Sequence, residues 1–169
     1  MTVSLYTFVD LYSRALTTVS HLLTKGAAHA ATNGVSEAEM LGWRLIDDMQ
    51  PLSFQVAVVC NFAVQWPARA AGLSIPEDVG SDLDLAGFQA AIAGAKQYLA
   101  GLTAEQFDGR DDAPVQYLIG GAMDMTLPAG QWISVFATTN LYFHMSTAYG
   151  ILRAKGVAIG KPDLFAGGL

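Results

Sequence analysis

Apolar side chains recur every three or four residues over much of the chain, a spacing that places them along one face of an α-helix. In the first stretch these residues are Leu5, Phe8, Tyr12, Leu16, Val19 and Leu23. They predict a helix from about Ser4 to Thr32, which the pair Asn33-Gly34 ends by supplying a left-handed residue. A later stretch contains Leu85, Phe88, Ile92, Ala95, Leu99 and Leu102. It predicts a helix that begins near Asp84 and ends near Gly101.

The segment between these two helices predicts another helix, which is long and bent. Ser36 and Glu39 form the Ser-x-x-Glu pattern of a capping box, and apolar residues continue from there to Ala71. Pro51 lacks the N–H that an interior helical residue donates, so we expect a kink near residues 47–50. Pro67 predicts a second bend before this helix ends.

The last third of the sequence predicts a small β-hairpin followed by a final helix. Gly120-Gly121 is a two-residue turn signal between the short apolar stretches Val115–Ile119 and Met123–Leu127. The final helix is expected from about Gln131 to Lys155, where Gly156 ends it. Taken together, residues 1–169 predict one all-α domain, a four-helix bundle with one long crossover and a small β-hairpin before the last helix.

The composition bears on the partners of this bundle. Hydrophobic residues make up 52% of the chain and charged residues only 14%, against about 25% charged in an average soluble protein. Much of the helical surface must therefore be covered by other helices or by a second subunit, and we expect a homodimer. The formal net charge is −6, and the nine Lys and Arg residues are spread along the chain. These residues form no basic patch that could neutralise the phosphates of a nucleic acid, so nucleic acid is not expected as a partner.

Cysteine usage and the uncharged stretches bear on location. Cys60 is the single cysteine, so the chain has no intrachain disulfide and no CxxC motif, which is typical of a reducing compartment. The first residues lack the basic and apolar regions of a secretory signal, and we expect a cytoplasmic protein. Residues 49–68 and 125–152 carry no charge but contain Gln, Asn or His, so we expect them inside protein and not in a membrane.

Candidate chemistry centres on the last predicted helix. Asn140 and His144 lie four residues apart on its apolar face, where unpaired polar groups are unfavourable. Asp48 is the best candidate partner, with Gln55 seven residues further along the same face of the bent helix. We therefore expect Asp48, Gln55, Asn140 and His144 to form a buried polar cluster. Tyr149, on another face, is expected in core packing or a dimer interface, with stacking on a ligand as the alternative.

Three interpretations of this cluster stay open at this point. It is a hydrogen-bonded network that only fixes packing, a divalent metal site formed by Asp48, Asn140 and His144, or a metal-free ligand or catalytic pocket. In the last case His144 is the acid or base and Asp48 orients it. The two other histidines, His21 and His29, lie away from the apolar face of their helix and are expected to face solvent.

Several motifs resemble one domain-of-unknown-function family that is related to the DinB and YfiT-like bundles. They are Asp48-Met49-Gln50-Pro51-Leu52 with Gln55, Asn140-Leu141-Tyr142-Phe143-His144, Thr147-Ala148-Tyr149, Ile151-Leu152-Arg153, Gly156-Val157 and Gly160-Lys161. The resemblance spans almost the whole chain and implies a four-helix bundle that is often dimeric.

The resemblance also implies a divalent metal such as zinc or nickel, held by one histidine on the second helix and two on the last. Here those positions fall near Asp48 and on Asn140 and His144, so only one histidine is kept. The sequence thus favours an uncharacterised DinB-like protein that binds a small molecule or acts as a metalloenzyme through this cluster. The alternative is a non-catalytic structural or interaction bundle.

Overall fold

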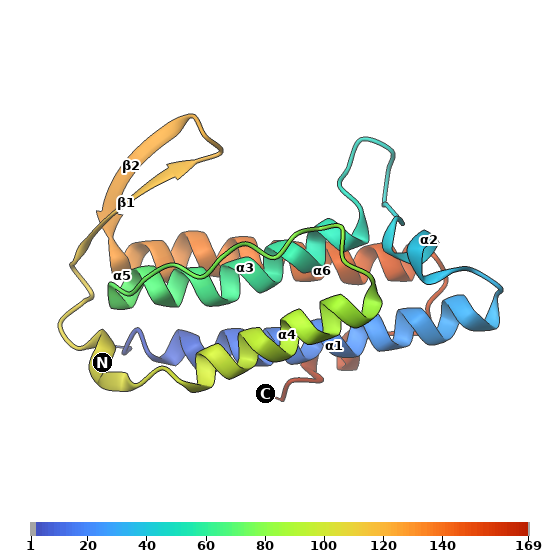
Figure 1. The fold of residues 1–169 in the computed structure, drawn as a ribbon, viewed down its shortest axis with the longest axis horizontal. Helices are drawn as coiled ribbons and strands as arrows, with labels where there is room; N and C mark the ends of the chain where they lie inside the picture. Colours follow the sequence, from blue (N-terminus) through green and yellow to red (C-terminus); the bar gives the residue numbers. More distant parts are fainter. Residues whose placement is uncertain (1–2, 169) are drawn as a thin grey trace.

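The computed structural model describes residues 3–168, which are mostly helical and include one antiparallel hairpin. The elements are α1 (Thr7–Thr32), α2 (Glu37–Leu41), α3 (Leu52–Ala71), α4 (Leu85–Ala100), η1 (Ala104–Phe107), β1 (Pro114–Ile119), β2 (Met123–Pro128), α5 (Ala129–Gln131), η2 (Trp132–Ala137), α6 (Thr138–Ala154) and η3 (Lys161–Phe165). In Figure 1, α3 and α6 lie side by side above the pair α1 and α4. No helix within residues 3–168 is both long enough and apolar enough to cross a membrane.

The helix predicted from the first apolar repeat is confirmed as α1. Tyr12, Leu16 and Val19 are fully buried, and α1 packs against α3, α4 and α6. The helix ends where predicted, because Gly34 has a φ of 68° and takes the left-handed conformation that a side chain disfavours. The third predicted helix is also present as α4, where the Asp84 side chain accepts a hydrogen bond from the backbone N–H of Gly87 at 2.7 Å.

The expected bent helix between them is wrong, because residues 42–51 form a loop. The helix α2 begins as predicted, with the Ser36 hydroxyl accepting from the N–H of Glu39 at 3.1 Å, but it ends at Leu41. Pro51 then caps the start of α3 with an extended backbone instead of kinking a continuous helix. A proline also disfavours the helical conformation in the residue before it, which explains this choice. The N–H of Leu52 donates to the carbonyl of Trp43 at 2.8 Å and closes the loop.

The predicted hairpin is present, and its register pairs Ile119 with Met123. Gly120 and Gly121 have φ values of 59° and 73°, as a tight hairpin turn requires, but Ala122 adds a third residue to the loop. The hairpin is fixed to the bundle at its base, where Trp132 donates its indole N–H to the carbonyl of Val115 at 2.8 Å. Figure 1 shows the hairpin and the loop of residues 42–51 rising from the same side of the bundle, at opposite ends of α3 and α6.

The final helix starts with a wider turn than the sequence predicts. Residues Trp132–Ala137 are π-helical, and α6 follows without a break. A π turn leaves backbone carbonyls displaced from the usual pattern. Here the carbonyl of Ile133 accepts from the hydroxyls of Thr138 at 2.7 Å and Tyr12 at 3.0 Å. This turn changes which residues face the core, so that Leu141 is fully buried whereas Asn140 is only half-buried.

Candidate functional site

His144 and Gln55 form a polar contact between α6 and α3. The imidazole Nδ1 of His144 lies 2.7 Å from the side-chain oxygen Oε1 of Gln55. Gln55 is buried with 3% of its surface exposed, whereas His144 is half-buried and keeps one side toward solvent. The Gln55 amide Nε2 donates to the backbone carbonyl of Gln50 at 3.0 Å. The amide of Gln55 therefore has both of its ends occupied.

These contacts fix the protonation of the His144 ring. The carbonyl of Gln50 only accepts hydrogen bonds, so the NH2 end of Gln55 points to it and the oxygen points to His144. An amide oxygen also only accepts, so Nδ1 of His144 carries the proton. Burial lowers the pKa of His144 from its usual value of 6.5, which favours the neutral ring. The other nitrogen, Nε2, then keeps its lone pair, and within residues 3–168 it has no hydrogen-bond partner.

Two aromatic rings flank the imidazole. Phe54 from α3 lies with its ring centroid 6.0 Å from that of His144, and Phe143 from α6 lies at 5.1 Å, both edge to face. Phe143 is 58% exposed, so it adds an apolar surface beside the ring and does not shield it from solvent. These neighbours were not predicted from the sequence. The adjacency of Phe54 to Gln55 and of Phe143 to His144 was the signal that was available.

The expected burial of Asp48 is wrong. Asp48 lies exposed on the loop of residues 42–51, and within the described part of the chain no hydrogen bond joins it to His144. The physical reason is the loop: the prediction assumed that residue 48 lies on a continuous helix, whereas a carboxylate on an exposed loop stays hydrated. The partner of the imidazole is thus a neutral amide and not a carboxylate.

The other predicted site residues are also placed by the structure. Asn140 donates its side-chain amide to the carbonyl of Phe136, one turn earlier on its own helix, at 2.8 Å. It lies one turn before His144 without a hydrogen bond to it in the described residues. Tyr149 is half-buried and packs against the core. The structure therefore brings together Gln55 and His144 and leaves Asp48, Asn140 and Tyr149 apart from that contact. The catalytic and ligand-binding roles of all five stay predictions.

The residues present do not fit the zinc or nickel site that the resemblance implies. Residues 3–168 contain no group of three or more His, Cys, Asp or Glu side chains arranged to hold a metal ion. Of the expected ligands, Asp48 is exposed on a loop, and Asn140 uses its amide within its own helix. One neutral imidazole is left, which is fewer than the three protein ligands of typical zinc sites.

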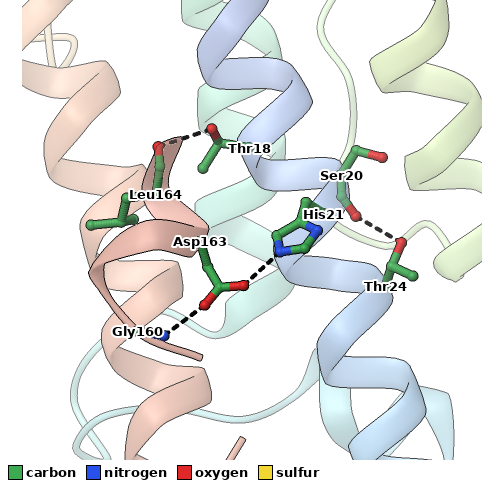
Figure 2. Close-up of polar contacts among 7 residues, drawn as sticks. All are labelled: Thr18, Ser20, His21, Thr24, Gly160, Asp163 and Leu164. Carbon is green, nitrogen blue, oxygen red and sulfur yellow. Dashed lines mark hydrogen bonds and ion pairs between the residues drawn. The ribbon is translucent and has the colours of Figure 1, made fainter. Parts of the chain in front are cut away.

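The histidines expected to face solvent are instead half-buried beneath the C-terminal segment. Figure 2 shows His21 of α1 pointing to Asp163 of η3, with 2.7 Å between Nε2 and Oδ1. The other oxygen of Asp163 accepts from the N–H of Gly160, and Thr18 donates to the carbonyl of Leu164 at 3.1 Å. The hydrogen bond from His21, followed by that from Gly160, holds the pKa of Asp163 below its usual value. This arrangement ties η3 to α1.

His29, one of the two, lies near the end of α6, where its Nε2 is 3.1 Å from the carbonyl of Lys155. Sequence reasoning missed both contacts because each joins residues more than a hundred positions apart. The one local signal was the spacing Gly160-x-x-Asp163, which is that of a capped turn.

Comparison with known proteins agrees with this architecture. A crystal structure of a DinB family member protein from Shewanella denitrificans has a TM-score of 0.85 and 31% sequence identity to this chain. The alignment covers 95% of this chain and 90% of that one. No curated protein matches the sequence. The family described as domain of unknown function DUF1993 matches residues 5–165. Because this match spans nearly the whole sequence, the protein belongs to the DUF1993 family, a DinB-like branch of domains of unknown function.

Proposed function

We propose that this DinB-like protein binds a small molecule beside His144, and that His144 accepts a proton from that molecule without the help of a metal ion. One observation carries the proposal: Gln55 holds Nδ1 of His144 at 2.7 Å in the protonated form, which leaves Nε2 as the basic atom. A general base must have a lone pair available and a pKa that leaves it unprotonated near neutral pH. The orientation by Gln55 meets the first condition, and the lowered pKa meets the second.

The proposed proton transfer involves two groups only. An O–H or N–H of the bound molecule gives its proton to Nε2, and the ring becomes an imidazolium whose Nδ1–H still donates to Gln55 Oε1. A carboxylate at residue 55 would stabilise the imidazolium and raise the pKa of the ring, whereas the neutral amide does not. His144 is thus suited to accepting a proton for a short time and releasing it again.

Matched small molecules test this proposal. We would titrate phenol, which has a hydroxyl proton, and anisole, in which a methyl group replaces it, while following the side-chain nitrogens of His144 by NMR. We expect phenol to shift the Nε2 signal in a saturable way and anisole to leave it in place. In His144→Gln, with an unchanged amide spectrum elsewhere, the phenol effect on the surrounding residues should disappear. Equal shifts with both compounds, or with neither, would contradict the proposal.

A non-catalytic role for this contact is the second candidate, and one observation favours it. Gln55 joins α3 to α6 and to the carbonyl of Gln50, with both the oxygen and the nitrogen of its side-chain amide hydrogen-bonded, as a purely structural bridge would. The two roles differ in the free nitrogen, since a bridge needs Nδ1 alone. The phenol titration therefore separates them.

The finer points of the architecture and assembly belong to the same proposal. We take the arrangement of α1, α3, α4 and α6 to be a DinB-like four-helix bundle with one long crossover, as the similarity to the Shewanella denitrificans protein supports. A homodimer in the cytoplasm stays a prediction from composition. The exposed Tyr142 and Phe143 of α6 offer apolar surface for such a contact. Analytical ultracentrifugation of Phe143→Glu and of the unchanged chain tests this contact. We expect a dimer for the unchanged chain and a monomer for the variant, and equal masses for both would contradict a dimer contact at Phe143.

A further inference from the structure

A cavity lies between the inner face of the hairpin and the helical segment that precedes α6, and it is separate from the contact between Gln55 and His144. Its volume is about 340 Å³, within the range of about 300–1,000 Å³ that small-molecule pockets occupy. The hairpin side and the helical side are formed by Ile119, Met125, Leu127, Trp132, Val135 and Phe136. Val135 is 60% exposed and lies at the rim.

The packing at the base of the hairpin fixes the hairpin against the helices that line this cavity. Tyr117 of β1 packs against two tryptophans of the bundle, with its ring centroid 4.9 Å from that of Trp66 and 5.8 Å from that of Trp132. The indole N–H of Trp132 is already bonded to the carbonyl of Val115, so the ring presents only carbon atoms to the cavity. The helical side includes Trp132, Val135 and Phe136 of the π turn Trp132–Ala137, a distortion that recurs at functional sites.

The chemistry of the lining selects an uncharged ligand. Within the described residues, the cavity is lined by no charged side chain, and its polar members are Gln131, Thr139 and Asn140. A charged group would lose its hydration there without gaining a partner, which is unfavourable. Asn140 donates its amide to Phe136, so its oxygen Oδ1 is left to accept a hydrogen bond.

We propose that this cavity binds the apolar, uncharged body of a small molecule whose hydroxyl or N–H group reaches His144. This inference rests on the proposed function for the role of His144 and on the cavity alone for the apolar body. Asn140 lines the cavity and precedes His144 by four residues on the continuous helix α6. Four residues rise about 6 Å along a helix and lie on the same face. A ligand held in the cavity therefore needs to extend only about one helical turn to reach the imidazole.

Two fluorescent dyes that differ by one charge test the cavity. N-phenyl-1-naphthylamine is neutral, and 1-anilinonaphthalene-8-sulfonate is the same ring system with a sulfonate. We expect the neutral dye to bind the full chain with a stoichiometry of one and at least about tenfold more tightly than the anionic dye. The variant Met125→Trp fills the cavity and should weaken binding of the neutral dye about tenfold, a loss of about 1.4 kcal/mol.

The matched control lies on the same hairpin. Leu118 is 50% exposed and is not part of the cavity lining, so Leu118→Trp adds the same ring outside it and should leave the affinity within twofold. If Met125→Trp does not fold, Val135→Glu at the exposed rim serves instead and should also weaken binding. Equal effects of the cavity and control variants would overturn the inference. So would weaker dye binding as protein concentration rises, because a second copy of the chain would then cover the cavity.

The variant His144→Gln separates this inference from the proposed function. It should abolish the phenol response of the site. It should weaken binding of N-phenyl-1-naphthylamine less than Met125→Trp does, because only the single N–H of the dye reaches the imidazole. If dye binding follows the cavity variants while phenol has no effect on His144, the cavity stands and the proton-accepting role fails. If phenol acts on His144 while Met125→Trp and Leu118→Trp bind the dye equally, the cavity fails and the proposed function stands.

Discussion

Replacing Gln55 by glutamate should reverse the effect of pH on the contact with His144. The substitution keeps the length of the side chain and puts a carboxylate oxygen where Oε1 now lies 2.7 Å from Nδ1. An opposite charge at this distance favours the charged imidazole and moves a pKa by about one to three pH units. The pKa of His144, which burial holds below 6.5 in the unchanged protein, should therefore rise above that value.

The change in stability follows from this reversal. In the unchanged protein the unfolded chain takes up the proton first as pH falls, so the contribution of His144 is fully present above about pH 6.5 and is lost as pH falls through the lowered pKa. In Gln55→Glu the contribution is fully present below about pH 6.5 and is lost as pH rises through the raised pKa. A shift of one unit in the pKa corresponds to about 1.4 kcal/mol of unfolding free energy. Because one side of the ring is exposed to solvent, we expect a shift of about one unit, the lower end of the range for an opposite charge.

Two measurements follow the reversal. NMR titration of the histidine rings gives the pKa of His144, and urea denaturation at about one pH unit below and above 6.5 gives the slope of the unfolding free energy. Gln97→Glu adds the same charge on the exposed face of α4 and is the control. A raised pKa with slopes of opposite sign in the two proteins is the expected result. A pKa of His144 that stays unchanged or falls in Gln55→Glu would show that residue 55 does not contact the ring in solution.

Three further predictions concern other parts of the chain. Asp163→Asn should speed amide hydrogen exchange in residues 160–168 at neutral pH, because it weakens the contact with His21. In the unchanged protein, the protection of these amides should be lost as pH falls through the lowered pKa of Asp163. Equal exchange in both proteins at neutral pH would contradict the anchoring of η3. Trp132→Phe removes the bond to the carbonyl of Val115 and should lower the unfolding free energy by about 1–3 kcal/mol in urea denaturation, whereas no change would mean that the bond is absent in solution. Elemental analysis of protein purified without chelator should give zinc and nickel far below one per chain, in His144→Ala as in the unchanged protein, and one metal per chain would refute the stated misfit.

The sequence predicts the parts of the fold in which local pattern and long-range packing agree. The repeat through Tyr12, Leu16 and Val19 gives α1 because the same residues that favour a helical stripe are the ones that end up fully buried. The hairpin is predicted because glycines with positive φ are needed at its turn. The sequence also places Gln55 and His144 in one polar cluster, because each is a polar residue on an otherwise apolar helix face, and the structure shows their contact.

The sequence does not predict the features that depend on contacts outside a single helical turn. A proline is compatible with a kink or with a helix start, and the choice at Pro51 is made with the bond from Leu52 back to Trp43. In the π turn, the carbonyl of Ile133 accepts a hydrogen bond from the hydroxyl of Tyr12, which lies more than a hundred residues earlier. Both errors shift residues between the core and the surface, and they account for the misplaced Asp48 and for the half-buried Asn140.

The loop at residues 42–51 also decides the chemistry available to His144. The sequence predicts a carboxylate beside the ring, and a carboxylate there would keep the ring charged and offer an oxygen ligand to a cation. With Asp48 exposed, the ring faces the amide of Gln55, which fixes Nδ1–H without adding charge. Under the proposed function, a neutral imidazole with a free Nε2 beside apolar rings would accept a proton from an uncharged molecule, and the ligand proposed for the uncharged cavity one turn away is of the same class. The loop before Pro51 thus bears directly on the proposed chemistry, because it leaves His144 beside a buried amide and not beside a carboxylate.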